Sequence, residues 1–249
     1  MELGLAGLSA VVTGGSAGIG SAIVRTLAGE GCNVAFCART ETNVRAMEQG
    51  LSGLPGKVSG SAIDVTDSHA LSGWIDGMDR IDILIANVSA ISPDWQQSFE
   101  VDIMATVNAI EAALPALQSS SNAAITYIGS LATDSSTPGV PGYGAAKKAM
   151  EYHIRNVARE YALQGIRANI VSPGTTFVEG GWWDNIRRNQ PDMFASAIRT
   201  IPLGRMGTGD EIARVVAFIS SPVASFVAGA NWFADGAQSL PTFADAGPQ

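Results

Sequence analysis

A serine, a tyrosine and a lysine in the middle of this 249-residue chain have the types and spacing of an acid–base site. Tyr143 and Lys147 stand four residues apart in a helical pattern, which places both side chains on one helical face. An ammonium there favours the phenolate and brings the pKa of Tyr143 closer to neutrality. Ser130 follows the apolar run 123–128, a pattern typical of a buried strand, and its hydroxyl is placed to hold a carbonyl or alcohol oxygen. Tyr-x-x-x-Lys by itself is common on amphipathic helices, so the wider pattern has to decide.

A glycine-rich turn near the amino terminus supplies that wider pattern. The run 8–13 is typical of a short buried strand, and Gly14, Gly18 and Gly20 follow it directly. A helical pattern begins at Ile19. Glycines between a strand and a helix allow the backbone to approach a pyrophosphate at the helix N-terminus. The spacing is Gly-x-x-x-Gly-x-Gly rather than the general Gly-x-Gly-x-x-Gly, and the alternative is a flexible turn without a ligand.

Taken together, these two motifs resemble those of the short-chain dehydrogenase/reductase family, and the resemblance covers nearly the whole chain. It implies reversible hydride transfer between a nicotinamide cofactor and a carbonyl or secondary alcohol. In that scheme Ser130 orients the substrate oxygen and Tyr143 exchanges the proton. Lys147 lowers the pKa of Tyr143 and holds the nicotinamide ribose. The alternative is a cofactor-binding sensor or structural protein with little turnover.

Seven short apolar runs alternate with helical patterns and predict an α/β fold. We expect a single domain over residues 1–249, a three-layer doubly wound Rossmann fold with a parallel sheet of about seven strands and helices on both faces. The expected strands are 8–13, 33–38, 58–63, 81–86, 123–128, 166–171 and 230–236. Residues 177–203 lack a sheet pattern and are expected to form a substrate lid, and the tail 241–249 is expected to be loose. Trp182 and Trp183 belong to this lid; the alternative is that they pack against the core or a partner subunit.

The end of the second expected strand indicates the cofactor. Ala38 stands where dinucleotide folds place an acid that binds the ribose hydroxyls, and Arg39 follows it. A guanidinium offers planar donors that suit a 2′-phosphate, so NADP is expected over NAD, with Thr40 and Ser16 as helpers. The alternative is that Arg39 is a surface cation that stacks on adenine with either cofactor.

The resemblance implies further cofactor contacts along the chain. Asp64 and Val65 are expected to flank the adenine, and the turn at Pro173 and Gly174 to meet the nicotinamide side. Val178 stands where the family often has a threonine, so Thr175 or Thr176 is the expected substitute. The full expected set is Gly14, Ser16, Gly18, Ile19, Gly20, Arg39, Thr40, Asp64, Val65, Asn87, Tyr143, Lys147, Pro173, Gly174 and Thr176.

Two departures from the family pattern stand out. Asn87-Val88-Ser89 replaces the usual Asn-Ala-Gly with bulkier residues. Asp102 replaces an asparagine that is thought to hold a water in a proton relay from the active-site lysine to solvent. A carboxylate near Lys147 raises the pKa of the lysine and weakens its pull on Tyr143, whereas a protonated Asp102 mimics the asparagine. The remaining alternative is that Asp102 bonds backbone groups at a helix irregularity.

Composition excludes several other classes of function. The net charge of −8 argues against non-specific binding to nucleic acid or to an anionic membrane. The sequence has no run of 18 apolar residues and no signal peptide, so we expect a cytoplasmic protein. Cys32 and Cys37 are expected to be reduced and structural, and the isolated histidines to bind no metal.

The expected substrate is a small-to-medium apolar ketone of the 3-oxoacyl, steroid-like or aromatic kind. The family resemblance implies a homotetramer, with a dimer as the alternative.

Overall fold

Seven parallel strands form the central sheet, in the order β3-β2-β1-β4-β5-β6-β9. We obtained a computed structural model of the chain, which describes residues 2–134 and 139–240. The predicted doubly wound α/β fold is confirmed, and the order reverses between β1 and β4 as the chain crosses from one half of the sheet to the other. The strands are β1 (Ser9–Thr13), β2 (Asn33–Ala38), β3 (Val58–Ala62), β4 (Ile83–Ala86), β5 (Ala124–Ile128), β6 (Arg167–Pro173) and β9 (Asn231–Ala234).

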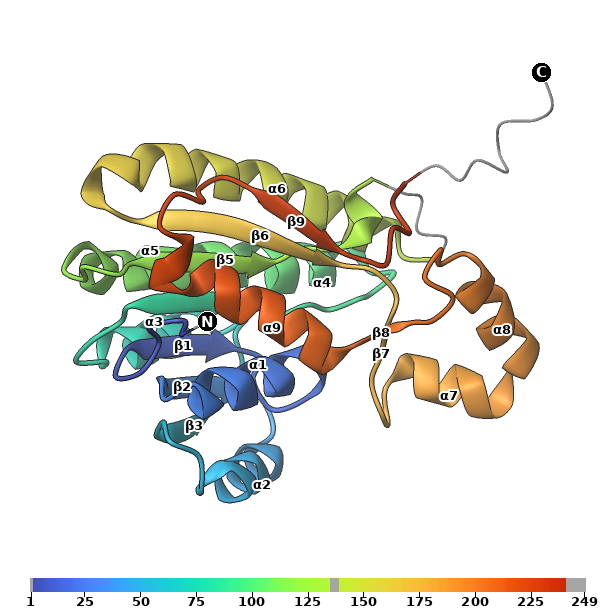
Figure 1. Cartoon of the computed structure of the whole chain (residues 1–249), viewed down its shortest axis with the longest axis horizontal. Coiled ribbons are helices and arrows are strands. Elements are labelled where there is room, and N and C mark those ends of the chain that lie inside the picture. The colour runs from blue at the N-terminus through green and yellow to red at the C-terminus, as the bar shows by residue number, and fades with distance from the viewer. Residues whose placement is uncertain (1, 135–138, 241–249) are drawn as a thin grey trace.

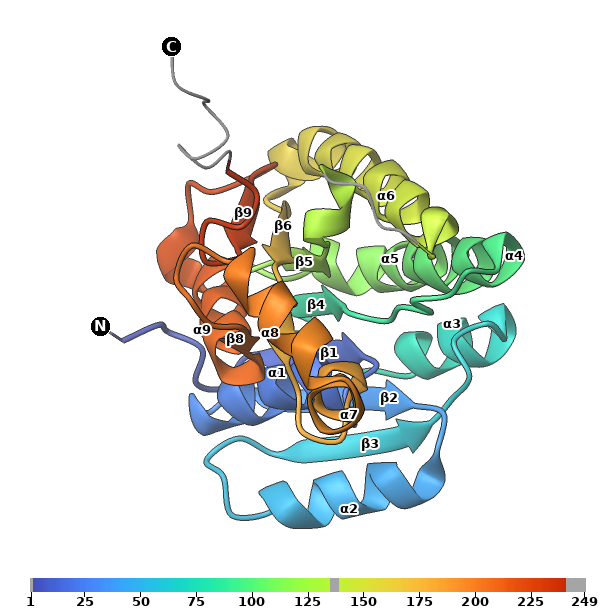
Figure 2. The same ribbon diagram turned by 90° about the vertical axis from the view of Figure 1, so that its right-hand side faces the viewer.

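Helices cover both faces of this sheet and divide the core in two (Figures 1 and 2). One core packs α1 (Gly18–Gly29), α2 (Glu41–Leu51) and α9 (Gly209–Ser220) against the sheet. The other packs α3 (Ser68–Asp76), α5 (Ala105–Gln118) and α6 (Pro141–Tyr161). Because β1, β4 and β5 lie between two helical layers, nearly all their residues are buried and most are apolar, as is typical of parallel sheets.

The helical segment over 95–118 is interrupted. It consists of α4 (Trp95–Ser98), a π-helical turn at Phe99–Met104 and then α5. A π turn widens the backbone ring and is often found at functional sites. Asp102 lies in this turn, which confirms the expected alternative of a helix irregularity at this residue.

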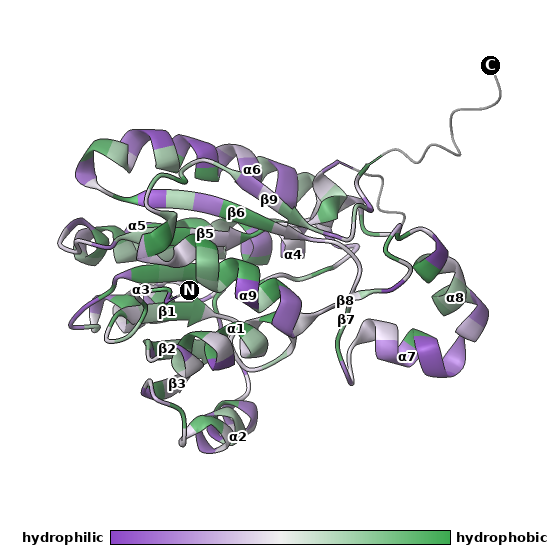
Figure 3. Cartoon of the chain, in the orientation of Figure 1, coloured by the Kyte–Doolittle hydropathy of each residue, from purple (hydrophilic) through white to green (hydrophobic). Residues whose placement is uncertain are grey.

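The segment between β6 and α9 extends beyond the sheet at the carboxyl ends of its strands (Figure 1). It contains α7 (Trp182–Asn189) and α8 (Pro191–Arg199), and a two-stranded sheet of β7 (Thr176–Phe177) and β8 (Gly207–Thr208) ties its two ends together. Phe177 therefore belongs to a short strand, which the absence of a sheet pattern did not predict. Figure 3 shows that α7 is largely hydrophilic, in contrast to the central strands.

Three further observations concern local structure and membrane association. Asp67 caps α3 by accepting a hydrogen bond from the backbone N–H of Ala70. Cys32 and Cys37 are buried and unpaired, in agreement with the expectation of reduced, structural cysteines. Among the described residues no helix is long and apolar enough to cross a membrane. The predicted loose tail, 241–249, lies outside the described residues.

Candidate active site

Ser130, Tyr143 and Lys147 come together at the carboxyl ends of β5 and β6. Ser130 follows β5 and caps a 3₁₀ turn by accepting a hydrogen bond from the N–H of Ala132 at 3.1 Å. Tyr143 lies in the first turn of α6, and its phenol is hydrogen-bonded to the side chain of Ser130. Lys147 Nζ lies 5.7 Å from the centre of the Tyr143 ring, so the spacing of four does place both groups on one face.

Burial, rather than the ammonium, dominates the pKa of the phenol. Burial raises the pKa of Tyr143 above its ordinary value, the hydrogen bond from Ser130 lowers it, and the charge of Asp102 raises it again. The pKa of Lys147 is lowered, chiefly by burial, and Asp102 opposes that change. The expected net pull of Lys147 on the phenol is therefore offset, because the lysine charge is desolvated and paired.

Asp102 faces Lys147 directly. Lys147 Nζ lies 3.5 Å from Asp102 Oδ1 and donates a hydrogen bond to the carbonyl oxygen of Ile128 at 3.1 Å. Asp102 also accepts hydrogen bonds from Ser89 Oγ at 2.5 Å and from the N–H of Ala90 at 3.2 Å. Two of the alternatives from the sequence therefore apply at once. Asp102 lies at a helix irregularity and accepts from a backbone N–H, and it is also the acidic partner of Lys147.

Sequence reasoning missed two members of this cluster. Ser89 was expected only to be bulkier than the usual glycine, and its hydrogen bond to Asp102 was not predicted. Tyr127 of β5 lies under the lysine, with its ring centre 4.8 Å from Lys147 Nζ. Its hydroxyl is buried without a hydrogen-bond partner, and burial holds its pKa well above the ordinary value. No spacing signal in the sequence distinguishes Tyr127 from any other core residue of a strand.

The glycine-rich turn is built so that only glycines fit. Gly14 and Gly18 have φ angles of +71° and +58°, and a Cβ at Gly20 would lie 2.1 Å from the carbonyl oxygen of Gly14. Asn87 Nδ2 fastens this turn to the end of β4 by donating to the carbonyl oxygens of Thr13 and Gly14. No side chain caps the first turn of α1, which leaves backbone N–H groups available to an anion. This cradle fits the pyrophosphate of a dinucleotide.

The other expected cofactor residues surround this cradle to different degrees. Ser16 is half-buried in the turn, and Ile19 packs partly on the core. Val178 lies beside Gly18, with its Cγ2 3.9 Å from the position that a Cβ there would take. Pro173 is buried, and Gly174 fits so closely that a Cβ would lie 2.7 Å from the Cα of Asp235.

Thr176 and Val88 complete the neighbourhood of the turn. Thr176 Oγ1 donates a hydrogen bond to the carbonyl oxygen of Gly174 at 3.0 Å, and one of its lone pairs stays available to accept. Val88 packs against Gly14, since its Cγ1 lies 3.1 Å from the position of a Cβ at that glycine. The side chain of Val88 therefore occupies space that a Cβ at Gly14 would otherwise fill.

The adenosine end of the expected site is marked by Arg39 and Asp64. Both side chains are exposed. The pKa of Asp64 is lowered, first by hydrogen bonds from Thr66 and to a smaller extent by the charge of Arg39. Thr40 occupies the N-cap position of α2 without using its side chain there. The side chain of Val65, in contrast, is buried in the core at 7% exposure.

The predicted lid has a small aromatic core of its own. Phe194 of α8 contacts Phe177 and Trp183 edge-on, with ring centres 6.3 and 6.4 Å apart. The buried carboxylate of Asp184 accepts from the N–H of Gly180 at 2.9 Å and pairs with Arg187 and Arg188. Trp182 packs on Trp183 and is 59% exposed, so it does not pack into the main core of the chain.

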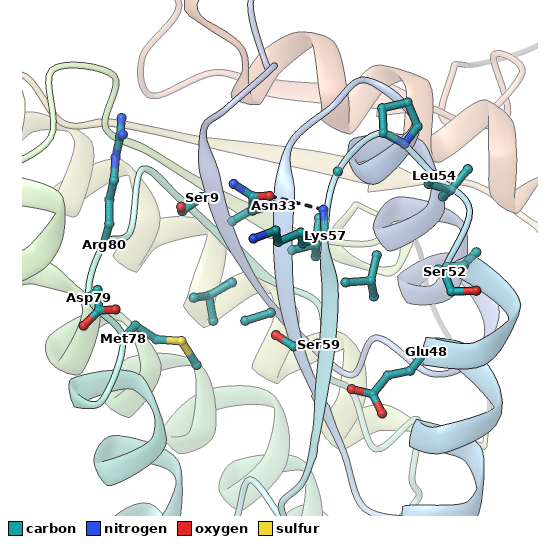
Figure 4. A pocket seen from close by; sticks show the side chains of 18 residues that line it. Ser9, Asn33, Glu48, Ser52, Leu54, Lys57, Ser59, Met78, Asp79 and Arg80 are labelled. Atoms are coloured by element: carbon teal, nitrogen blue, oxygen red, sulfur yellow. Dashed lines mark hydrogen bonds between the residues drawn. The ribbon is translucent and has the colours of Figure 1, made fainter.

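A groove of about 670 Å³ lies at the opposite end of the sheet, where β1, β2 and β3 begin. Figure 4 shows Ser9, Asn33 and Lys57 along its floor, with Glu48 and Arg80 on opposite sides. It contains none of the expected site residues, and in open parallel sheets ligands bind at the carboxyl ends of the strands.

Among the described residues there is no group of three or more acids, histidines or cysteines that could hold a metal.

Comparison with known proteins agrees with this geometry. The family model described as enoyl-(acyl carrier protein) reductase matches residues 14–237. An isoepoxydon dehydrogenase of Penicillium expansum is 34% identical over 95% of this chain and 96% of its own length. A 3-oxoacyl-(acyl-carrier-protein) reductase of Escherichia coli is 30% identical over 92% of this chain and 96% of its own. The crystal structure of an L-sorbose reductase from Gluconobacter frateurii, complexed with NADPH and L-sorbose, superposes with a TM-score of 0.89 at 23% identity, covering 97% of this chain and all of that one.

Proposed function

We propose that this chain, which belongs to the short-chain dehydrogenase/reductase family and is therefore an NAD(P)-dependent oxidoreductase, uses NADP(H) to interconvert a ketone and a secondary alcohol. The observation that carries the proposal is the hydrogen bond between Ser130 and Tyr143 with Lys147 beneath, beside the glycine cradle. NADPH, when bound, supplies the hydride. All other steps belong to side chains of this chain.

In the reductive direction the side chains move one proton. Ser130 donates a hydrogen bond to the substrate carbonyl oxygen and thereby polarises it. As the carbon accepts the hydride, Tyr143 Oη gives its proton to the developing alkoxide, and Lys147 stabilises the phenolate that forms. Because burial raises the pKa of Tyr143, the phenol is protonated at neutral pH. The phenol is thus in the protonation state that the reductive direction requires of a proton donor.

NADP is proposed over NAD because the end of β2 lacks an acid and provides Arg39. The unused side chain of Thr40 and the N-terminus of α2 add donors beside the guanidinium. Ser16 of the glycine-rich turn is the further proposed contact. The exposed position of Arg39 leaves it free to meet a 2′-phosphate.

The proposed substrate is a small-to-medium apolar ketone. The aromatic cluster of the lid, Phe177, Trp183 and Phe194, supports it, because this cluster extends from the same carboxyl ends of the strands as the acid–base residues. The relatives named for isoepoxydon and for a 3-oxoacyl group are consistent with carbonyl and alcohol chemistry. We propose residues 177–203 as the lid that excludes water during the transfer.

We also propose a homotetramer in the cytoplasm, built through two faces. Phe99 and Met104 beside α5 are exposed, and so are Trp232 and Phe233 on β9, the edge strand of the sheet. Exposed aromatic groups on a sheet edge are costly unless a partner covers them. The two unpaired buried cysteines suit a reducing compartment. Light scattering of the purified protein, with a tetramer, dimer or monomer as outcomes, tests the assembly.

The decisive experiment titrates the purified protein with NADPH and NADH and then offers the tighter cofactor with a panel of cyclic, 3-oxoacyl and aromatic ketones. Tyr143→Phe is expected to bind NADPH as the unchanged protein does and to lose about 10²–10⁴-fold in turnover, the usual contribution of a general acid. Tyr152→Phe is the matched control, since Tyr152 lies on the same helix and is 73% exposed. Tight cofactor binding without turnover of any ketone contradicts the reductase and favours the sensor.

A further inference from the structure

Ser89 and Asp102 are thirteen residues apart in sequence and form one buried hydrogen bond behind the active-site lysine. We propose that Ser89 is a positioning residue, which fixes the Asp102 carboxylate beside Lys147 and through it controls proton donation by Tyr143. The proposal rests on the function proposed above, and it adds a residue with no catalytic contact of its own.

The two carboxylate oxygens of Asp102 face three donors. Ser89 Oγ donates to Oδ1 at 2.5 Å, the N–H of Ala90 donates to Oδ2 at 3.2 Å, and Lys147 Nζ lies 3.5 Å from Oδ1. Asp102 is fully buried, and the separation to Ser89 is that of a charge-assisted O–H···O⁻ bond. A buried carboxylate with donors on both oxygens is held in one orientation, which fixes the distance between its charge and the lysine.

An amide at position 102 cannot satisfy the same three donors. Its single oxygen would accept from Ala90, and its NH₂ group would then face Ser89 and Lys147. A glycine at position 89, in turn, would leave Oδ1 with the lysine as its only close donor. The hydroxyl of Ser89 and the carboxylate of Asp102 are therefore complementary as donor and acceptor.

The charged and titratable groups around Asp102 define what this charge acts on. From α6 come Lys147 and Tyr143, and from β5 comes Tyr127, whose pKa is also raised by the charge of Asp102. The helix α4 contains no charged residue, and the single acid of α5, Glu111, is exposed. The carboxylate thus acts on one ammonium and two phenols, of which only Tyr143 is hydrogen-bonded to Ser130.

Substitutions at the two positions have opposite expected signs. Removal of the Ser89 hydroxyl leaves more unshielded negative charge on Asp102, so the pKa of Tyr143 rises further. Removal of the charge by Asp102→Asn lowers the pKa of Tyr143, because the lysine is then unopposed. In the Asp102→Asn background, Ser89→Ala has no charge left to redirect, and it is expected to change the titration little.

The test measures the titration of Tyr143 directly, by the ultraviolet absorbance of its phenolate, as the difference between each variant and the same variant carrying Tyr143→Phe. Ser89→Ala is expected to move the midpoint to higher pH by about half a unit or more, and Asp102→Asn to lower it by about one unit. Ser89→Thr, which keeps a hydroxyl, is expected to restore the original midpoint. Equal shifts for Ser89→Ala with and without Asp102→Asn, or no shift at all, overturn the proposal.

A second readout separates this proposal from the reductase itself. If ketones are turned over, the pH profile of kcat/KM is expected to move in the same direction as the phenolate titration, with the affinity for NADPH unchanged. If no ketone is turned over, the reductase fails, but the phenolate titration still decides the role of Ser89. Ser92→Ala is the matched control: Ser92 lies in the same loop and accepts from the N–H of Asp94, and no hydrogen bond joins it to Asp102 among the described contacts. It is expected to leave the midpoint unchanged, and a shift equal to that of Ser89→Ala contradicts positioning.

Discussion

Lys147 Nζ lies 3.5 Å from Asp102 Oδ1, and neither side chain is more than 2% exposed. A buried ion pair adds little net stability, because desolvation of both charges offsets their attraction, but removal of one partner leaves the other charge uncompensated. The Lys147–Asp102 pair therefore affects both the free energy of unfolding and the proposed proton donation by Tyr143. Each side chain is expected to be costly to replace alone and cheaper to replace together with its partner.

Lys147→Met is expected to lower the free energy of unfolding by about 3–5 kcal/mol, because Asp102 stays buried without its counter-charge. The double variant with Asp102→Asn is expected to recover at least half of this loss and still to lack turnover. Urea unfolding and a ketone assay measure the two quantities. Lys148→Met is the control: Lys148 is the next residue, its side chain is 54% exposed, and a loss below about 1 kcal/mol is expected. Additive losses in the double variant contradict the coupling.

Gly20→Ala is expected to abolish binding of NADPH and to destabilise the chain. Its Cβ would lie 2.1 Å from the carbonyl oxygen of Gly14 and 2.5 Å from Asn87 Nδ2, and backbone does not yield to such a contact without a shift of the turn. Gly29→Ala, at the other end of α1, meets nothing within 4 Å and is expected to stabilise the helix by about 0.5–1 kcal/mol. Cofactor fluorescence titration and thermal unfolding compare the two. If Gly20→Ala binds NADPH with undiminished affinity, the glycine-rich turn does not contribute to the cofactor site.

The sequence predicted the parts of this molecule that depend on local chemistry. Glycines at the end of a strand, and a phenol four residues before an ammonium, specify a turn and a helical face almost independently of the rest of the chain. The contacts that the sequence did not predict cross between elements. The bond from Ser89 to Asp102 depends on how the loop after β4 meets the π turn, and the position of Tyr127 under Lys147 depends on the packing of α6 on β5.

The pKa of Tyr143 shows the same limit. Spacing places the lysine close enough to lower this pKa, but burial raises it, and the extent of burial follows from tertiary packing. Sequence spacing therefore gave the partner of Tyr143 correctly and the net direction of its pKa incorrectly. For Asp102, spacing identified the unusual residue, and only the fold identified Ser89 as its hydrogen-bond donor.

Arg39→Gln is expected to weaken NADPH binding by about 10- to 100-fold and to leave NADH binding within about threefold, because one charge-assisted contact to a phosphate contributes about 1.5–3 kcal/mol. Arg45→Gln is the matched control, since Arg45 is an exposed arginine of the adjoining helix α2 and is paired with Glu41. Isothermal titration with both cofactors measures the ratio. Equal losses for NADPH and NADH show that Arg39 stacks on the adenine rather than binding a 2′-phosphate.

Glu211→Gln is expected to reduce stability in a pH-dependent way. Glu211 closes a capping box at the start of α9, and hydrogen bonds from Arg205 first, then from the N–H of Thr208, lower its pKa from 4.5 to about 2. Because its pKa is depressed in the folded chain, its contribution is fully present above about pH 4.5 and disappears as the pH falls through about 2. The carboxylate is partly exposed, which limits the difference at neutral pH to about 1 kcal/mol.

Urea unfolding at several pH values is therefore expected to show a constant gap between the unchanged chain and Glu211→Gln from neutrality to about pH 5, and a shrinking gap below it. Asp210→Asn removes one negative charge from the same helical turn, where Asp210 pairs with the exposed Arg25. It controls for the general effect of a lost surface acid, and its smaller gap is expected because no capping bond is lost. A gap for Glu211→Gln that stays constant down to about pH 3 shows that the capping box contributes through packing or helix propensity, and not through the ionised carboxylate.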